Sequence, residues 1–172
     1  MEAIEITARL MELSAVTAPK SKGVNFVQTR VLSGEVLSGL AQEMVRFGES
    51  CGKKDFDRDA KGVARSEAVV LIGIKDAQPV GLDCGACGFT DCKRFQSQAP
   101  TAGEFRGPAC AFRLLDMGIA LGSAVKTASL LNVDNRIMYR IGVVARRMGI
   151  VDWDFVMGIP LSATGKNIFF DR

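Results

Sequence analysis

The chain contains no histidine among its 172 residues, and this absence excludes several kinds of site. Imidazole supplies the nitrogen ligand of mixed cysteine-histidine zinc sites, Rieske centres and many haems. It is also the usual base of Ser-His-Asp and Cys-His nucleophiles. A reactive site in this chain must therefore use thiolate, carboxylate or amine groups, or a cofactor.

The sequence also lacks the features of a secreted, membrane-spanning or disordered chain. Residues 1–5 carry neither a basic nor an apolar leader segment. The longest weakly polar run, 117–125, is far shorter than the roughly 20 residues that span a bilayer. With 48% hydrophobic and 24% charged residues, the composition is that of a globular domain. We expect a cytoplasmic protein with no membrane span, folded as a single domain over residues 1–172.

The net charge of +3 is too small to indicate a nucleic-acid-binding protein. One predicted helix carries a basic face without interleaved aromatic residues, which is typical of a solvated helix surface. This face consists of Arg136, Arg140, Arg146 and Arg147. We expect no nucleic-acid partner, although such a face could dock an acidic redox partner.

Helices and strands intermix without a strict βαβ rhythm, which favours an α+β fold. Apolar spacing predicts a helix over 2–16, and β-branched residues predict a strand over 25–32. Ser33 is the expected N-cap of a helix that runs to about Gly48. The continuous apolar run 68–74 predicts a central strand buried on both faces.

The C-terminal part of the chain predicts a long helix over 111–131 and a second helix after it. Asp134 is the expected N-cap of that second helix, and Gly149 its C-terminal glycine. The stripe that this helix would bury consists of Ile137, Ile141, Val144 and Met148. A short strand over 155–157 and an extended tail over 158–172 complete the prediction.

Four of the five cysteines form a spaced set. Cys84, Cys87 and Cys92 have the spacing C-x2-C-x4-C, and Cys110 follows after 17 intervening residues. Such a set of soft ligands in a cytosolic chain favours metal or redox chemistry over disulfides. Glycine follows each of the first two cysteines, so the backbone can turn tightly there and direct N–H groups at sulfur.

Thiolates in this number can hold either an iron-sulfur cluster or zinc. Zinc sites more often use two closely spaced pairs of cysteines, so the wide separation of Cys92 from Cys110 favours a cubane cluster, with zinc and disulfides as alternatives. Cys92 is expected in the first turn of a helix, where the helix dipole lowers a thiol pKa. Nearby cations would make the site electropositive and raise a cluster's potential; they are Lys93, Arg94, Arg106 and Arg113.

The run from Cys84 to Phe95, with the later Cys110, resembles the [4Fe-4S] segment of electron-transport complex B subunits and of the corrinoid iron-sulfur protein. In that pattern a C-G-x-C-G-x-x-x-C run is completed by a more distant cysteine. The resemblance implies that Cys84, Cys87, Cys92 and Cys110 are the cluster ligands, in a segment 81–113 inserted between the central strand and the long helix. The whole chain also resembles the ferredoxin domain-containing family of archaea and anaerobic bacteria, which implies the cofactor but no particular reaction.

Residues 10–32 are similar to the nitroreductase pattern of a helix, an A-P-S run, spaced Asn and Gln residues, and a strand. Residues 116–128 and the later Gly-Ile-Pro-Leu run are similar to the central helix and final strand of that family. The resemblance implies a mainly antiparallel sheet packed with helices and a homodimer that binds FMN. It implies that Ser21, Asn25 and Gln28 line the FMN site, although Lys20 interrupts the A-P-S run.

The leading hypothesis from the sequence is a ferredoxin-like protein that transfers electrons through one [4Fe-4S] cluster to a redox partner protein. The alternatives are a flavin-dependent oxidoreductase on a nitroreductase-like homodimer and a nonenzymatic module stapled by zinc. No residue is identified as a catalytic acid or base. Cys51 lies outside the ligand set, and we expect it to be a buried structural cysteine, with a redox or labile-ligand site as the alternative.

Overall fold

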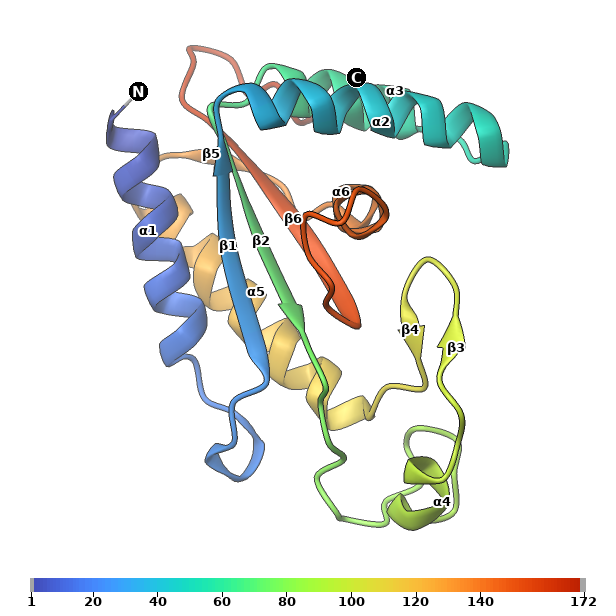
Figure 1. Ribbon diagram of the computed structural model, residues 1–172. Coiled ribbons are helices and arrows are strands. Elements are labelled where there is room, and N and C mark those ends of the chain that lie inside the picture. The colour runs from blue at the N-terminus through green and yellow to red at the C-terminus, as the bar shows by residue number, and fades with distance from the viewer. Residues whose placement is uncertain (1, 171–172) are drawn as a thin grey trace.

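The computed structural model describes residues 2–170 and has an antiparallel sheet with helices on both faces (Figure 1). The sheet has the strand order β1-β2-β6-β5. Its strands are β1 (Val27–Ser33), β2 (Ala68–Ile74), β6 (Phe155–Ser162) and β5 (Asp134–Asn135). All neighbouring strands in this sheet pair antiparallel, so the predicted α+β class with an antiparallel sheet is confirmed.

Strand β2 divides the core into two layers because its side chains alternate between the faces of the sheet. Every residue of β2 is buried, as its continuous apolar run predicted. Val70 and Ile72 pack into the layer beneath α1 (Glu2–Thr17) and α5 (Ala111–Leu130). Val69 and Leu71 pack into the opposite layer. The helices of that layer are α2 (Glu35–Cys51), α3 (Phe56–Ala64) and α6 (Tyr139–Arg147).

Close backbone approach joins α6 to the sheet. A Cβ atom on Gly142 would overlap the carbonyl of Val156, and a Cβ on Gly158 would overlap Ile141. The absence of side chains at these two glycines lets the helix and strand β6 lie directly against each other. This contact positions the start of β6, which lies beside the cysteine segment.

Three predicted boundaries near the sheet are wrong. Ser33 is the last residue of β1, and Gly34 with φ of 70° precedes α2 in place of a serine cap. Asp134 belongs to β5 and pairs with Ser162, so it does not cap a helix. The expected tail from residue 158 instead continues β6, whose Pro160 lies opposite Val69 on β2.

Helix α6 is consequently shorter than the sequence predicts. It begins at Tyr139 and buries Ile141 and Val144, which are the two central members of the predicted stripe. Ile137 and Met148 lie outside the helix, with exposed fractions of 41% and 39%. Gly149 ends it in the left-handed conformation with φ of 69°, as predicted.

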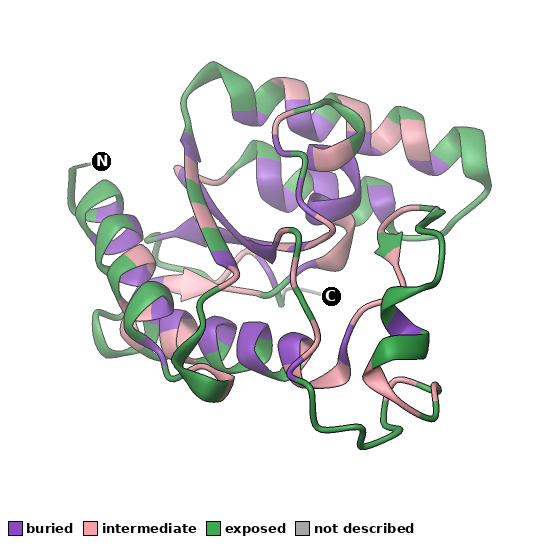
Figure 2. Ribbon diagram, turned by 60° about the horizontal axis from the view of Figure 1, so that its bottom comes forward, coloured by how far each residue is buried: buried purple, intermediate pink, exposed green. Residues whose placement is uncertain are grey.

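The segment between β2 and α5 projects from one end of the sheet (Figure 1). It contains the short helix α4 (Cys92–Gln96) and a hairpin of β3 (Thr101–Ala102) and β4 (Arg106–Gly107). Figure 2 shows that this segment is largely exposed or partly exposed, in contrast to the buried central strand β2. Within residues 2–170, no helix is long and apolar enough to cross a membrane.

Candidate metal centre

The four cysteines of the predicted ligand set line one hollow in the projecting segment. Cys84 and Cys87 lie in the loop after β2, Cys92 begins α4, and Cys110 directly precedes α5. The hollow measures about 320 Å³, including the part open to solvent. Cys84 is exposed, Cys87 and Cys92 are partly exposed, and Cys110 is buried; all are free thiols. The fold thus brings together cysteines from separate stretches of the chain.

Left-handed backbone shapes the loop that carries Cys84 and Cys87. Gly85 and Gly88 have φ values of 72° and 87°, which glycine adopts without steric cost. The N–H of Gly88 donates to the carbonyl of Gly85 at 2.9 Å and closes the turn between these two glycines. The predicted role of both glycines in tight turns is therefore confirmed.

Two aspartates that the sequence analysis missed hold the start of α4. Asp83 accepts a hydrogen bond from the N–H of Cys92 at 2.7 Å, which fastens the loop to the helix. Asp91 is the N-cap and accepts from the N–H of Arg94 at 2.8 Å. That backbone hydrogen bond, with a second one from the Thr90 hydroxyl, holds the pKa of Asp91 below its ordinary value. The position of Asp91 before a short helix was a detectable capping pattern, whereas the role of Asp83 depends on the fold.

A small apolar cluster lies behind the cysteines. Val80, Phe95 and Cys110 are buried together, and Phe89 packs against them. The rings of Phe89 and Phe95 meet edge to face with centroids 5.7 Å apart. These side chains keep water from the inner side of the hollow, while Cys84 faces solvent on the outer side.

Helix α5 begins from the buried cysteine. The carbonyl of Cys110 accepts hydrogen bonds from the N–H groups of Arg113 and Leu114 at 3.0 and 3.1 Å. The position of this cysteine is therefore set by the first turn of the long helix, which packs along α1 and the sheet.

The cysteine thiols and the acidic groups do not form a site for a single ion. Across residues 2–170, no three His, Cys, Asp or Glu side chains gather closely enough to hold one metal ion. The four cysteines nevertheless line the same hollow.

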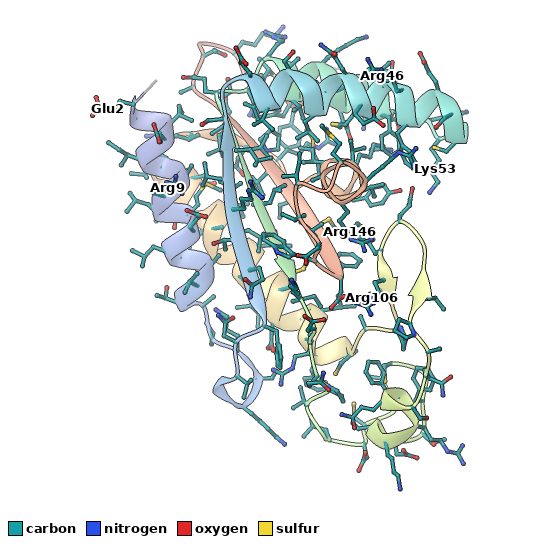
Figure 3. All side chains as sticks on the ribbon, viewed as in Figure 1. Glu2, Arg9, Arg46, Lys53, Arg106 and Arg146 are labelled. Carbon is teal, nitrogen blue, oxygen red and sulfur yellow. The ribbon has the colours of Figure 1, made fainter. Side chains whose placement is uncertain are left out.

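The predicted cationic environment is largely neutralised. Arg113 pairs with Asp116 at 3.0 Å, and both side chains are buried. Arg106 lies 3.6 Å from Asp154, at the end of β4 that faces β6 (Figure 3). Asp91 lies 3.8 Å from Arg94. The carboxylates cancel most of the positive charge that the sequence placed around the cysteines, so the expected rise in potential loses its main cause.

The hairpin before Cys110 is anchored to the opposite side of the protein. Glu104 accepts from Lys53 at 2.7 Å and from the Tyr139 hydroxyl at 2.8 Å. Partial burial raises the pKa of Glu104, but these two hydrogen bonds outweigh it and leave the pKa below its ordinary value. Burial and the hydrogen bond to Glu104 raise the pKa of Tyr139. The hairpin tip is thus tied to α6 and to the loop after α2.

The residues predicted for FMN lie elsewhere, near the start of β1. The backbone N–H and hydroxyl of Ser21 donate to Asp116 at 2.7 and 2.8 Å. Asn25 accepts from the N–H of Val27 at 3.0 Å, and Gln28 lies exposed on β1. Lys20 donates to carbonyls at the end of α1, and its desolvation lowers its pKa. None of these residues lines the cysteine hollow.

The Arg113 side chain connects the two regions. It donates to the carbonyl oxygens of Gln78, Ser21 and Val24 at 2.9 to 3.2 Å, in addition to its pair with Asp116. The loop that leads into the cysteine segment and the turn that carries Ser21 are therefore held by one buried guanidinium. The sequence analysis assigned Arg113 only a general electrostatic effect and missed this structural role.

The remaining cysteine does not behave as expected. Cys51 ends α2 and is exposed, so the prediction that it is buried is wrong. The Cys51 thiol donates to the carbonyl of Gly48 at 3.8 Å. It lies outside the hollow that the other cysteines line.

Structural comparison confirms the nitroreductase-like fold predicted from residues 10–32. The FMN-dependent nitroreductase of Mycobacterium smegmatis, solved with NADPH, aligns with a TM-score of 0.57 at 13% identity. That alignment covers 94% of this chain and 78% of the nitroreductase. A nitroreductase with bound FMN from Desulfitobacterium hafniense aligns with a TM-score of 0.57 at 12% identity, covering 94% and 79% of the two chains. Identities this low establish a shared fold.

Sequence comparison identifies a much nearer relative in the archaeon Archaeoglobus fulgidus. That protein, named only as an uncharacterized protein, is 48% identical over 171 residues, covering 99% of this chain and 92% of its own length. A family model described as "Uncharacterized protein containing a ferredoxin domain" matches residues 106–172, which include Cys110. The other three predicted ligands precede the matched residues. At 48% identity over nearly its whole length, the chain belongs to the same protein family as the Archaeoglobus fulgidus protein, and its C-terminal part matches the model described as containing a ferredoxin domain.

Proposed function

We propose that the protein transfers electrons through one [4Fe-4S] cluster held by Cys84, Cys87, Cys92 and Cys110. The observation that carries the proposal is that these four side chains, from separate stretches of the chain, line one hollow. The family's ferredoxin domain supports an iron-sulfur electron-transfer role in general terms. The resemblance of the segment to electron-transport complex B subunits supports the cluster type. In this proposal residues 81–113 form a cluster-binding insertion in a one-domain chain.

The cysteine spacing favours a cluster over zinc. Zinc sites more often use two closely spaced pairs of cysteines, whereas 17 residues separate Cys92 from Cys110. A cubane presents four iron corners, each of which takes one thiolate. All four cysteines border one partly open hollow.

The residues around the hollow fit an electron-transfer centre. A [4Fe-4S] cluster bound here would supply a reversible one-electron couple. The left-handed turns at Gly85 and Gly88 let the loop carry Cys84 and Cys87 to the same hollow without steric cost. Phe89 and Phe95 limit water on the inner side, and the exposed Cys84 provides the shortest route to a redox partner protein. Four cysteine ligands leave no iron corner open for a substrate.

The test compares two cysteine variants after anaerobic purification and reconstitution with iron and sulfide. The native chain is expected to hold about four irons and to show broad visible absorption that dithionite bleaches. Cys92→Ser is expected to lose iron and the absorption. Cys51→Ser is the matched control, because Cys51 is an exposed thiol outside the hollow, and it should keep both.

Two results would contradict the proposal. Full iron content in Cys92→Ser would remove that residue from the ligand set. A colourless native chain that binds one zinc tightly after anaerobic preparation would support the zinc-stapled module instead. Circular dichroism of the same samples separates ligand loss from unfolding.

A flavin-dependent oxidoreductase is the second candidate, and the fold favours it. Both nitroreductases described above are FMN proteins by their descriptions. In this chain the Ser21 hydroxyl is already bonded to Asp116, and the Asn25 side-chain oxygen to the N–H of Val27. Resolved flavin absorption bands in the purified protein, lost in Gln28→Ala, would support this candidate. A flavin-free protein that does not take up FMN would exclude it.

A second copy of the chain is the partner that the outer face of α1 fits best. Successive turns of this helix expose large apolar side chains on one side: Ile6, Leu10 and Leu13. Such a contiguous apolar face marks an interaction surface, and we propose a cytoplasmic homodimer. Sedimentation analysis should show a dimer, and Leu13→Glu should yield a folded monomer. A native chain that sediments as a monomer would refute the dimer.

A further inference from the structure

A second hollow lies directly beside the cysteine hollow, and Cys110 lines both. It measures about 750 Å³, including the part open to solvent. The end of β2, the segment after α4, and the stretch from Arg106 to Cys110 form its walls. Cys84, Cys87 and Cys92 do not line it. Pro79 and Cys110 line both hollows, so a molecule in the second hollow would lie against the buried cysteine of the first.

Flat apolar groups form much of the wall. Pro79, Pro100 and Pro108 line the hollow together with the ring of Phe95. Phe95 is 7% exposed and packs with Cys110 in the apolar cluster described above, so this part of the wall is rigid. The phenylalanine ring provides a flat surface that suits a planar ligand, and the prolines add apolar wall around it.

Amide groups form the polar edge of the hollow. Gln78, Gln96 and Gln98 line it, and each amide offers both a donor and an acceptor. Gln96 donates to Gln78 at 3.3 Å, and Gln78 and Gln98 donate to the carbonyls of Asp76 and Arg94. Each side-chain amide has two N–H groups and two oxygen lone pairs, so each still has a donor and an acceptor for a ligand. Paired donors and acceptors of this kind match the carbonyl and ring-nitrogen edge of a heteroaromatic compound.

The charges at the rim disfavour an anion. Arg106 is the cation of the lining, and Asp76 and Asp154 are its two carboxylates. Asp154 lies 3.6 Å from Arg106 and also accepts from the backbone N–H of Asp76 at 2.6 Å. The lining therefore carries an excess of negative charge and offers no unpaired cation to a phosphate or carboxylate.

We propose that this second hollow binds a small, neutral, planar heteroaromatic compound against Cys110. The role of the compound as an electron carrier rests on the proposed function, whereas its binding does not. The site is separate from the residues predicted to bind FMN, since Ser21, Asn25 and Gln28 do not line this hollow.

Equilibrium dialysis of the full chain against lumiflavin, a neutral flavin ring without a phosphate, tests the proposal. We expect saturable binding of one lumiflavin per chain. Ala109→Leu adds bulk inside the hollow and should weaken binding at least about tenfold. The matched control is Ala99→Leu, because Ala99 is exposed and does not line the hollow. This variant should bind like the native chain, and FMN should bind no more tightly than lumiflavin.

Three outcomes would overturn the inference. They are no saturable binding to the native chain, equal affinities for the Ala109→Leu and Ala99→Leu variants, and FMN binding that is much tighter than lumiflavin binding and insensitive to Ala109→Leu. Iron content is measured on the same samples. If the native chain takes up no iron but lumiflavin binding still responds to Ala109→Leu alone, the electron-transfer proposal fails and the ligand site stands.

Discussion

Replacing Asp116 by alanine should strongly destabilise the protein, because this carboxylate neutralises a buried guanidinium. The side chains of Arg113 and Asp116 are only 4% and 5% exposed, and they meet at 3.0 Å. The second oxygen of Asp116 accepts the N–H and hydroxyl of Ser21 at 2.7 and 2.8 Å. Asp116→Ala therefore leaves one buried charge unpaired and two donors unsatisfied.

The expected loss is about 3–5 kcal/mol, which is the usual cost of removing one partner from a buried ion pair. A natural domain has only about 5–15 kcal/mol of stability in total. The substitution should also loosen the cysteine segment, because Arg113 donates to the carbonyl of Gln78 in the loop that leads into that segment. Iron uptake by Asp116→Ala should fall together with its stability.

Urea unfolding followed by circular dichroism measures this loss, with Asp152→Ala as the control. Asp152 pairs with Lys75 at 2.6 Å, but its side chain is 75% exposed, so water replaces the lost contact and the change should be small. A loss below about 1 kcal/mol in Asp116→Ala would refute the reasoning. A double variant, Arg113→Met with Asp116→Leu, should be less destabilised than the sum of the single variants. Additive losses would show that the two side chains are not energetically coupled.

Two further predictions concern helix packing and the hairpin anchor. Gly142→Ala should cost about 3 kcal/mol or more by urea unfolding, because its Cβ would overlap a backbone carbonyl of β6. Gly118→Ala, on an open face of α5, should instead stabilise the protein by about 0.5–1 kcal/mol. Similar changes in unfolding free energy for the two variants would refute the close packing of α6 on β6. Hydrogen bonds from Lys53 and Tyr139 outweigh partial burial and lower the pKa of Glu104 in the folded protein below 4.5. The stability that ionised Glu104 adds to the fold is therefore fully present above pH 4.5 and is lost as the pH falls through the lower folded pKa. Thermal melts at several pH values from neutral to about pH 3 test this. Glu104→Gln should be less stable than the native chain at neutral pH and equally stable at the acidic end. A stability difference that does not change with pH would contradict the prediction.

Elements with a strong local pattern were predictable. The apolar run of β2 indicated a strand buried on both faces, and the structure has that strand at Ala68–Ile74. The long helix was predicted to within one residue of its observed end at Leu130. Errors arose where long-range pairing decides the structure. Asp134 looks locally like a helix cap, but its backbone completes the sheet beside Ser162.

The cysteines of the candidate site could be singled out from the sequence, whereas their surroundings could not. Spacing alone singled out the four cysteines that line the hollow. Spacing could not reveal that Asp83 accepts a hydrogen bond from the N–H of Cys92, because this bond forms only when the loop folds back and brings the two residues together. It also could not reveal that the nearby arginines are paired with carboxylates from other elements, as Arg106 is with Asp154.

The sequence by itself determined which chemistry is open to this protein: with no histidine and a spaced set of cysteines, thiolate ligation is the simplest complete coordination. The spacing of the candidate ligands and their neighbouring glycines is a local property, because it lies in a short stretch of chain. Only the tertiary structure decided that Cys110 lines two hollows and that Cys51 is exposed. Hollows, exposure and charge pairing depend on which distant segments pack together, and β2, α5 and the hairpin meet only in the folded chain.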